Sequence, residues 1–268
     1  YKRQVVEDHF NELVIDLVNP AGQPERMQLV VRGYNDGFAF CYKIPDGKGP
    51  CVNVQSELTA YNFAGDYTAW FYNGENHNIG PEKLTETDGT RLPVMTVKAG
   101  DKHYMAILEA CLETGAPLVL QSKGGESLFS VASKPTSLSP GYTSAWRVVL
   151  YGTTPGVLTD SHLLELLNPD PDSRYDFSWV KPGLAVWDWR INGAVWDGFT
   201  YGMSYPSWVR MVDFAAEQGF KYLVLDANWY GPEFESDSDP VKGEKAQDVQ
   251  RLLKYGKEKG VGIWLYLN

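Results

Sequence analysis

The sequence predicts two kinds of structure in succession: an antiparallel β-sandwich with its linker over residues 1–175, then the start of a (β/α)8 barrel over residues 176–268. Two observations lead to this prediction. Short apolar runs punctuated by Gly, Pro, Asn and Asp fill the first part, as expected of a sandwich. In the second part, apolar runs alternate with helical patterns, which is typical of parallel β/α units. The predicted fold class is therefore multidomain, β followed by α/β.

The first part contains short runs rich in β-branched and aromatic residues, which predict strands. These runs cover residues 12–18, 27–32, 38–43, 95–98, 103–108 and 146–151. Asp36-Gly37 is a strong short-range signal for a hairpin, and residues 19–22 (NPAG) predict another turn. A short helix is expected over residues 159–167, capped by Thr159 or Asp160, and the Pro-rich residues 168–173 mark a linker.

The second part predicts three strands and two helices. The strands are expected at residues 186–189, 221–226 and 261–268, and the helices at residues 205–218 and 248–259. In such barrels the side chains at the carboxyl ends of the strands build the active site. Because a barrel needs eight strands, we expect the chain to be part of a longer enzyme.

The amino-acid composition argues against some classes of binding partner and favours a neutral sugar. The net charge of −10 argues against nucleic acid or anionic membrane as partners, and no apolar run approaches a membrane span. The three cysteines lack metal-ligand spacing, so one pair could form a disulfide, or all three are buried free thiols. Seven of the nine tryptophans follow residue 178. A Trp-rich, acidic cleft suits a neutral sugar, because aromatic faces stack on sugar C–H groups.

Six motifs, in this order along the chain, resemble glycoside hydrolase family 97. They are residues 32–40 (RGYNDGFAF), 143–149 (TSAWRVV), 163–168 (LLELLN), 178–183 (SWVKPG), 187–189 (WDW) and 212–217 (VDFAAE). The resemblance runs over essentially the whole chain. It implies an N-terminal β-super-sandwich, a catalytic (β/α)8 barrel and a small C-terminal β domain. Residues 226–229 (DANW) depart from a common family form, which leaves subsite preference open.

The resemblance also implies a function: hydrolysis of terminal α-linked glucose or galactose of oligosaccharides, assisted by calcium. It implies that the family's sandwich begins before Tyr1 and that its barrel continues past Asn268. Glycoside hydrolysis needs two carboxyl groups, and the resemblance places them downstream of Asn268. It further suggests a periplasmic or extracellular location. The choice between glucoside and galactoside, and between retention and inversion, stays open.

The resemblance and the strand pattern together nominate the site residues. Glu109 follows an apolar strand and precedes Ala110, like the family's sandwich glutamate that reaches the barrel and ligates Ca²⁺. The candidates for substrate binding lie at or near predicted strand ends: Trp187, Asp188, Asp226, Trp229 and Asn268. Asp226 would either anchor a substrate hydroxyl or a loop, or make structural hydrogen bonds. Direct catalysis is the third alternative for this residue.

A second function class is a non-catalytic carbohydrate-binding sandwich module. Its feature would be a set of exposed aromatic side chains on the sandwich: Tyr61, Phe63, Trp70, Phe71 and Tyr72. Further β/α units with acidic strand ends beyond residue 268 would favour the enzyme over this module.

Overall fold

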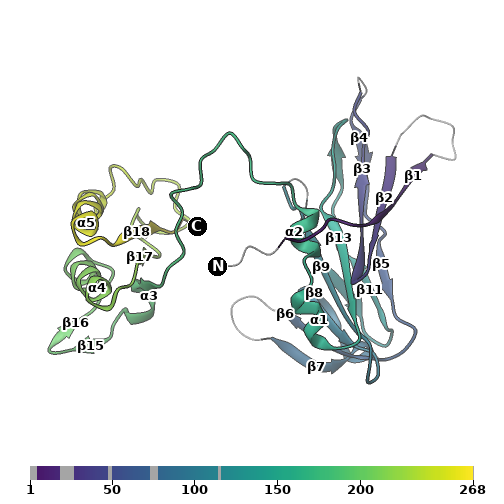
Figure 1. Cartoon of the computed structure of the whole chain (residues 1–268), viewed down its shortest axis with the longest axis horizontal. Coiled ribbons are helices and arrows are strands. Elements are labelled where there is room, and N and C mark those ends of the chain that lie inside the picture. Colours follow the sequence, from purple (N-terminus) through teal and green to yellow (C-terminus); the bar gives the residue numbers. More distant parts are fainter. Residues whose placement is uncertain (1–4, 19–26, 48–49, 73–77, 114–115, 268) are drawn as a thin grey trace. The chain divides into compact units, whose positions relative to one another are not determined.

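A computed structural model describes residues 5–18, 27–47, 50–72, 78–113 and 116–267. The chain divides into two compact units, Tyr1–Pro171 and Asp172–Asn268 (Figure 1). The boundary expected from the sequence, near residue 175, lies a few residues beyond this division. Residues 19–22, where the sequence predicts a turn, lie outside the described ranges.

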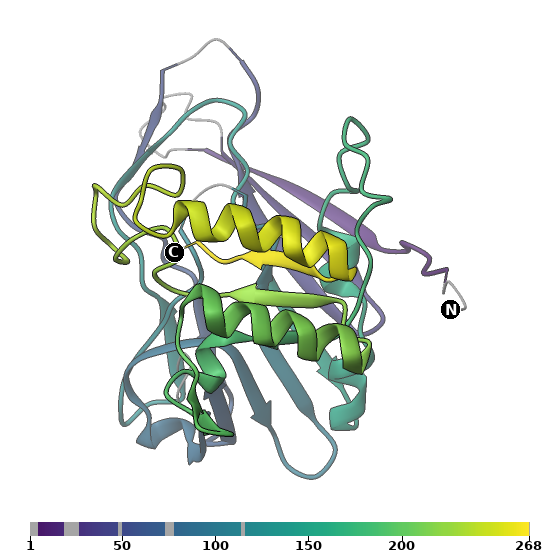
Figure 2. The same ribbon diagram turned by 90° about the vertical axis from the view of Figure 1, so that its left-hand side faces the viewer.

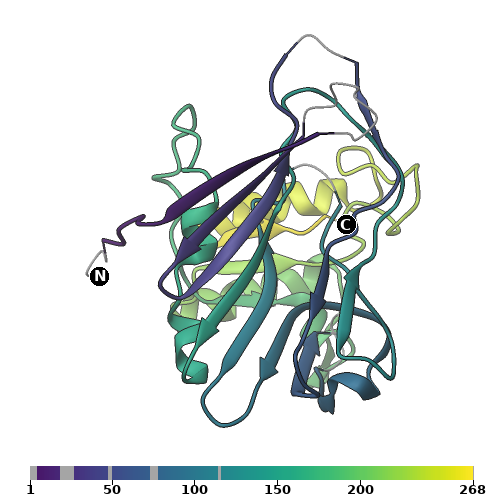
Figure 3. The ribbon, with the colours of Figure 1, turned by 90° about the vertical axis from the view of Figure 1, so that its right-hand side faces the viewer.

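The first unit is antiparallel β throughout its described sheets, as predicted (Figure 3). Within the described residues its main sheet has eleven strands in the order β1-β2-β3-β13-β9-β8-β10-β11-β5, and β6 pairs with both β8 and β7. The strands are β1 (Asn11–Leu17), β2 (Met27–Tyr34), β3 (Gly37–Lys43), β5 (Ala60–Asn62), β6 (Thr68–Tyr72), β7 (Ile79–Lys83), β8 (Asp88–Lys98), β9 (Tyr104–Ala110), β10 (Leu120–Lys123), β11 (Leu128–Val131) and β13 (Trp146–Gly152). A separate pair joins β4 (Val52–Val54) to β12 (Thr136–Leu138), and one 3-10 turn, η1, covers Leu84–Glu86.

The long strand β8 links the two parts of this sheet. Its second half pairs with β9 and β6, whereas its first four residues pair with β10. Two apolar cores result. One contains Phe71, Met95 and Phe129, and the other contains Ala39, Cys41 and Val148.

The hairpin predicted at Asp36-Gly37 is confirmed. β2 and β3 are joined by a two-residue turn, and Tyr34 pairs with Gly37. A Cβ atom on Gly37 would lie 2.3 Å from the backbone oxygen of Val149. Glycine is therefore needed here for the close approach of β13.

The single helix predicted over residues 159–167 is wrong in its bounds and its cap. The structure has two short helices, α1 (Pro155–Asp160) and α2 (Leu163–Leu167). Ser161 separates them because its backbone is extended, with φ −67° and ψ 137°. Pro155 occupies the first turn of α1, where its missing N–H costs nothing. Leu163 and Leu167 are buried against the sandwich core, so the predicted apolar face is correct for them.

The second unit contains a three-stranded parallel sheet in the order β14-β17-β18. The strands are β14 (Ala185–Trp187), β17 (Tyr222–Leu225) and β18 (Gly262–Leu265). The helices are α3 (Asp188–Ile191), α4 (Tyr205–Gln218) and α5 (Ala246–Lys259), and a small hairpin pairs β15 (Val195–Trp196) with β16 (Phe199–Thr200). The predicted order of strands and helices is confirmed. The first strand is shorter than predicted, because Asp188 and Trp189 already belong to α3.

The two faces of this sheet differ. Leu223 and Leu225 are fully buried in a core that they share with residues of α4 and α5. Figure 2 shows both helices on one face of the sheet. Trp187, Val224 and Trp264 are aligned across the three strands and point to the opposite face, because side chains alternate along a strand. Within the described ranges, no helix is long and apolar enough to cross a bilayer.

Candidate functional site

Asp188 lies directly after β14 and is almost fully buried, with 1% of its surface exposed. Its Oδ2 accepts a hydrogen bond from the Trp208 indole of α4 at 2.9 Å. Its Oδ1 accepts from the backbone N–H of Asp226 at 3.0 Å. Burial raises the pKa of Asp188, and the hydrogen bonds from Asp226 and Trp208 oppose that shift only in part. Substrate contact was predicted for Asp188, but the structure places this carboxylate inside the unit, between three elements.

Asp226 lies at the carboxyl end of β17 and is half-buried. Its Oδ2 accepts a hydrogen bond from the indole N–H of Trp187. Trp187 remains 38% exposed, and the guanidinium of Arg190 lies 4.8 Å from the centre of its ring. The structure therefore brings together two of the predicted site residues, an indole and a carboxylate, at the carboxyl edge of the parallel sheet.

Trp229 occupies a different environment from the one predicted. Its side chain is 4% exposed and belongs to the core between the sheet and its helices. Its Nε1 donates to the backbone oxygen of Tyr266 at 2.6 Å, which joins the segment after β17 to the end of β18. Its indole is thereby committed to structural contacts. Asn268, the remaining candidate, lies outside the described residues.

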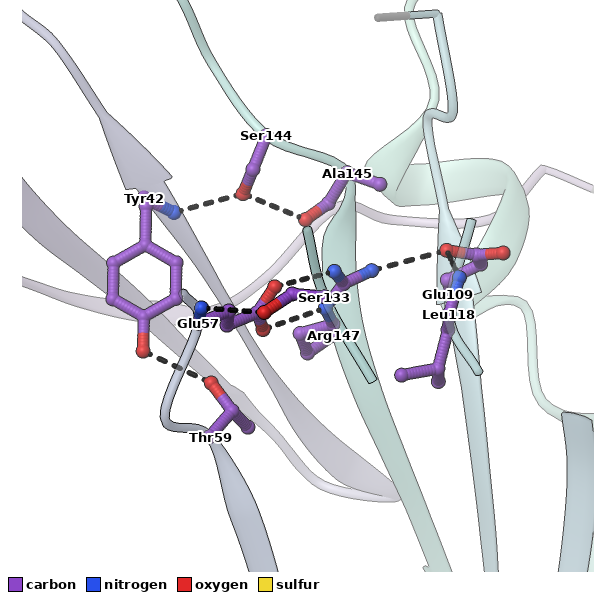
Figure 4. Close-up of polar contacts among 9 residues, drawn as sticks. All are labelled: Tyr42, Glu57, Thr59, Glu109, Leu118, Ser133, Ser144, Ala145 and Arg147. Carbon is purple, nitrogen blue, oxygen red and sulfur yellow. Dashed lines mark hydrogen bonds and ion pairs between the residues drawn. The ribbon is translucent and has the colours of Figure 1, made fainter. Parts of the chain in front are cut away.

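Glu109, the predicted calcium ligand, lies in β9 of the sandwich and is part of a charged group of three residues (Figure 4). Its Oε2 accepts from Arg147 Nη1 at 3.1 Å and from the backbone N–H of Leu118 at 2.8 Å. Arg147 in turn donates to both oxygens of Glu57, at 3.1 and 2.8 Å. Burial alone would lower the pKa of Arg147, but its hydrogen bonds to Glu57 and the charges of Glu57 and Glu109 raise it.

Of this charged group, only Glu109 is a candidate calcium ligand. With both carboxylates ionised, Glu57, Glu109 and Arg147 carry one net negative charge. Carboxylates that bind metals are usually held by further hydrogen bonds, as the Oε2 atom of Glu109 is. However, among the residues that the structure describes, no group of three or more His, Cys, Asp or Glu side chains could hold a metal. A Ca²⁺ ion takes 6–8 oxygens, so further ligands would have to come from elsewhere.

A cavity of about 810 Å³ opens beside Arg147 and Glu57 in the sandwich. Tyr42 and Tyr142 are among its lining residues, and Tyr42 donates or accepts a hydrogen bond with Thr59 at 3.0 Å (Figure 4). The aromatic row predicted to be exposed for a binding module is wrong for all its members except Tyr72. Phe71 is 1% exposed, and the others, Tyr61, Phe63 and Trp70, are half-buried. Phe71 packs inside the core beside Phe129 of β11, with ring centres 5.6 Å apart.

The functional residues that the sequence argument missed are Arg147, Glu57 and Trp208. Arg147 gave a usable signal, since a charged residue inside the apolar run 146–151 indicates a buried, paired charge. Trp208 belongs to the apolar stripe of α4, so nothing in its spacing distinguished the donor from ordinary core. Glu57 precedes a short strand that the sequence did not predict.

Two family models match the two units separately. Residues 1–169 match the N-terminal domain model of glycosyl hydrolase family 97, and residues 186–268 match the model of glycoside hydrolase 97. The chain belongs to glycoside hydrolase family 97. This family assignment covers both the antiparallel sandwich and the parallel β/α part.

Two named relatives and a solved structure are similar to this chain. A "retaining alpha-galactosidase" from Bacteroides thetaiotaomicron is 26% identical over 99% of this chain and 45% of its own length. A "probable retaining alpha-galactosidase" from Streptomyces bingchenggensis is 29% identical over 91% of this chain and 38% of its own length. A family 97 enzyme from Pseudoalteromonas sp. strain K8, solved with acarbose, superposes with a TM-score of 0.72 at 24% identity, over 98% of this chain and 43% of that one. The chain thus spans less than half of each relative.

Proposed function

We propose that this chain is part of an α-glycosidase that removes terminal α-linked galactose or glucose from oligosaccharides, with galactose favoured. The observation that carries the proposal is the pair formed by Trp187 and Asp226 at the carboxyl edge of a parallel sheet. Membership of family 97 and two relatives that carry the name retaining α-galactosidase support it. We propose retention of the anomeric configuration because both of these relatives carry the word retaining in their names. A location outside the cytoplasm stays a prediction.

The three parallel strands are proposed to be the first strands of a (β/α)8 barrel. In such barrels the helices cover the outside and layers of side chains from neighbouring strands fill the inside. α4 and α5 cover one face of the sheet (Figure 2). On the other face, Trp187, Val224 and Trp264 form one aligned layer. Their arrangement supports an interior position for this layer and an active-site position for Asp226.

Trp187 and Asp226 have the chemistry that a sugar requires. A half-exposed indole offers an apolar face for the C–H groups of a pyranose ring. A carboxylate accepts hydrogen bonds from sugar hydroxyls, and such charge-assisted bonds are stronger than neutral ones. The bond from Trp187 occupies Oδ2 of Asp226, so the orientation of the carboxylate is set before a ligand arrives. We assign substrate binding to these two residues.

Calcium is proposed as the cofactor, with Glu109 as one of its oxygen ligands. When bound, Ca²⁺ would polarise an oxygen of the substrate as a Lewis acid. Arg147 and the Leu118 N–H both donate to Oε2 of Glu109, and these hydrogen bonds restrain the orientation of the carboxylate. The catalytic acid and the nucleophile are proposed to lie in later strands, as the family resemblance implies.

The test is the activity of the full-length protein on p-nitrophenyl α-galactoside and p-nitrophenyl α-glucoside, with anomeric analysis of the product. We expect hydrolysis of at least one substrate with retention. Asp226→Asn should raise KM about tenfold, the effect of a lost hydrogen bond to a charged group. Asp213→Asn is the matched control, because Asp213 is a half-exposed residue of α4 that pairs with Lys259 and Tyr255 of α5, away from Asp226 in the hydrogen-bond network. No turnover of either substrate by the folded protein would contradict the proposal.

A further inference from the structure

Asp188 holds a position that substrate binding does not explain. We infer that it is a positioning residue, which fixes the place of Asp226 at the carboxyl edge of the sheet. The inference rests on the proposed sugar site at Asp226 and adds a residue that does not itself touch the substrate. Three parts of the second unit meet at this one carboxylate: the start of α3 directly after β14, helix α4, and the residue that follows β17.

Asp226 is held at its backbone and at its side chain. Its backbone N–H donates to Asp188 Oδ1 at 3.0 Å, and its side chain accepts from the indole of Trp187. Trp187 and Asp188 are consecutive residues, at the end of β14 and the start of α3. Two neighbouring residues therefore bind Asp226, one at its backbone N–H and one at its side chain. These residues are 38 and 39 positions away from Asp226 in the sequence.

Asp188 itself is held by a buried side chain of α4. Oδ2 accepts from Trp208 Nε1 at 2.9 Å, and Trp208 of α4 is 1% exposed in the core between the sheet and its helices. A large buried indole has little freedom to move, so it anchors the carboxylate. The chain of contacts runs from the packed helix through Asp188 to the backbone of Asp226.

Burying the carboxylate of Asp188 costs free energy. A buried carboxylate loses solvation, and hydrogen bonds offset this cost without making the site more stable than an apolar one. The two hydrogen bonds instead give precise placement, because supporting contacts hold a site residue within roughly 0.5 Å of its working position. Misplacement by about 1 Å can reduce activity about 100-fold. The carboxylate of Asp188 therefore fixes the position of Asp226 at the carboxyl edge of the parallel sheet.

The experiment uses the full-length protein with p-nitrophenyl α-galactoside and p-nitrophenyl α-glucoside. Asp188→Asn keeps the shape of the side chain but turns an amide donor toward one of its two N–H partners. Trp208→Phe removes only the indole donor and keeps an aromatic ring in the core. We expect Asp188→Asn to raise KM about tenfold with a smaller change in kcat, the effect of a lost hydrogen bond to a charged group. Trp208→Phe should change KM in the same direction by a smaller factor.

Two further measurements separate positioning from stability alone. The backbone amide of Asp226 should exchange with solvent faster in Asp188→Asn than in the parent, while amides in the middle of β9 keep their protection. Asp213→Asn makes the same substitution at a half-exposed position of α4, where it weakens contacts to α5, and it should change neither KM nor this exchange while the protein is fully folded. Kinetics are measured at a temperature where circular dichroism shows each variant fully folded.

The outcomes are distinguishable. Unchanged KM and unchanged exchange at Asp226 in folded Asp188→Asn would overturn the positioning role, while a raised KM in Asp226→Asn would leave the proposed sugar site standing. Unchanged KM in Asp226→Asn would instead remove the sugar site itself. Should Asp188→Asn fail to fold, Trp208→Phe decides. A wild-type KM and wild-type amide exchange at Asp226 in that variant would then show that Trp208 does not hold Asp188 in place.

Discussion

Arg147 donates to both oxygens of Glu57, through Nε at 3.1 Å and Nη2 at 2.8 Å. The two residues are 90 positions apart in sequence, and the contact ties β13 to the segment between β4 and β5. Arg147 is only 4% exposed, so the pair is largely removed from water. Such a two-bond contact restricts both the distance and the orientation of its partners.

Loss of the Arg147 guanidinium should destabilise the sandwich strongly. Arg147→Met leaves the carboxylates of Glu57 and Glu109 mostly buried without their cation, and breaking a buried pair in this way costs about 3–5 kcal/mol. Arg147→Lys should fall between wild type and Arg147→Met, since an ammonium cannot make the two-bond contact. Urea denaturation followed by circular dichroism measures the free energy of unfolding.

Arg251→Met is the control for that series. Arg251 is exposed and pairs with Asp248 one helical turn away, so its loss should change the free energy of unfolding by less than about 1 kcal/mol. Equal stability losses for Arg147→Met and Arg251→Met would show that the buried ion pair has no special role.

Glu109→Gln and Glu57→Gln should separate calcium binding from ion pairing in the full-length protein. Both variants weaken contacts to Arg147, so both should lower the melting temperature in EDTA. If Glu109 is a calcium ligand, only Glu109→Gln should lower calcium affinity, by roughly 1–3 kcal/mol for one charged oxygen. Calorimetric titration with Ca²⁺ measures this. Wild-type affinity in Glu109→Gln would take Glu109 out of the ligand set.

The three cysteines should react at very different rates. Burial raises the pKa of Cys41 to about 11, so this thiol stays protonated near neutral pH. Cys51 is exposed, whereas Cys111 is half-buried, so the prediction of three buried thiols is wrong for two of them. With iodoacetamide at neutral pH, Cys51 should be modified first and Cys41 only after denaturation. Peptide mass spectrometry gives the order, and rapid labelling of Cys41 in the folded protein would contradict it.

A disulfide between Cys41 and Cys111 is also excluded by the sheet order. Cys41 lies in β3 and Cys111 follows β9, and β13 lies between these two strands. Two strand spacings amount to roughly 9.6 Å, whereas disulfide-bonded residues have Cα atoms less than about 7 Å apart. The intact mass under non-reducing conditions should therefore show no bond between these cysteines.

Asp213 should make stability depend on pH in the acid range. Hydrogen bonds from Lys259 and then Tyr255 lower the pKa of Asp213 in the folded state. Since the folded pKa lies below the unfolded one, the stabilisation is complete above the unfolded pKa and is lost as pH falls through the folded pKa. The melting-temperature difference between wild type and Asp213→Asn should therefore shrink as pH falls below about 4. A difference that does not change with pH would show that this pairing does not affect stability.

The sequence alone determined six of the strands in the first part and the order of the main strands and helices in the second, but it did not indicate β4 to β7 or β10 to β12. Alternating apolar runs in the first part and the helical spacing of residues 205–218 and 248–259 are local patterns, and the structure has strands and helices at these places. The Asp-Gly turn is equally local, because its conformation depends on adjacent residues. Family membership followed from the same kind of information, since it rests on ordered motifs.

Only the tertiary structure decided what each candidate side chain does. Asp188 and Asp226 both stand near the ends of predicted strands, yet one is buried between Trp208 and a backbone N–H, whereas the other lies half-buried at the edge. Trp187 and Trp229 diverge in the same way. Burial and hydrogen-bond partners depend on contacts between residues 20 to 90 positions apart, which no local pattern encodes.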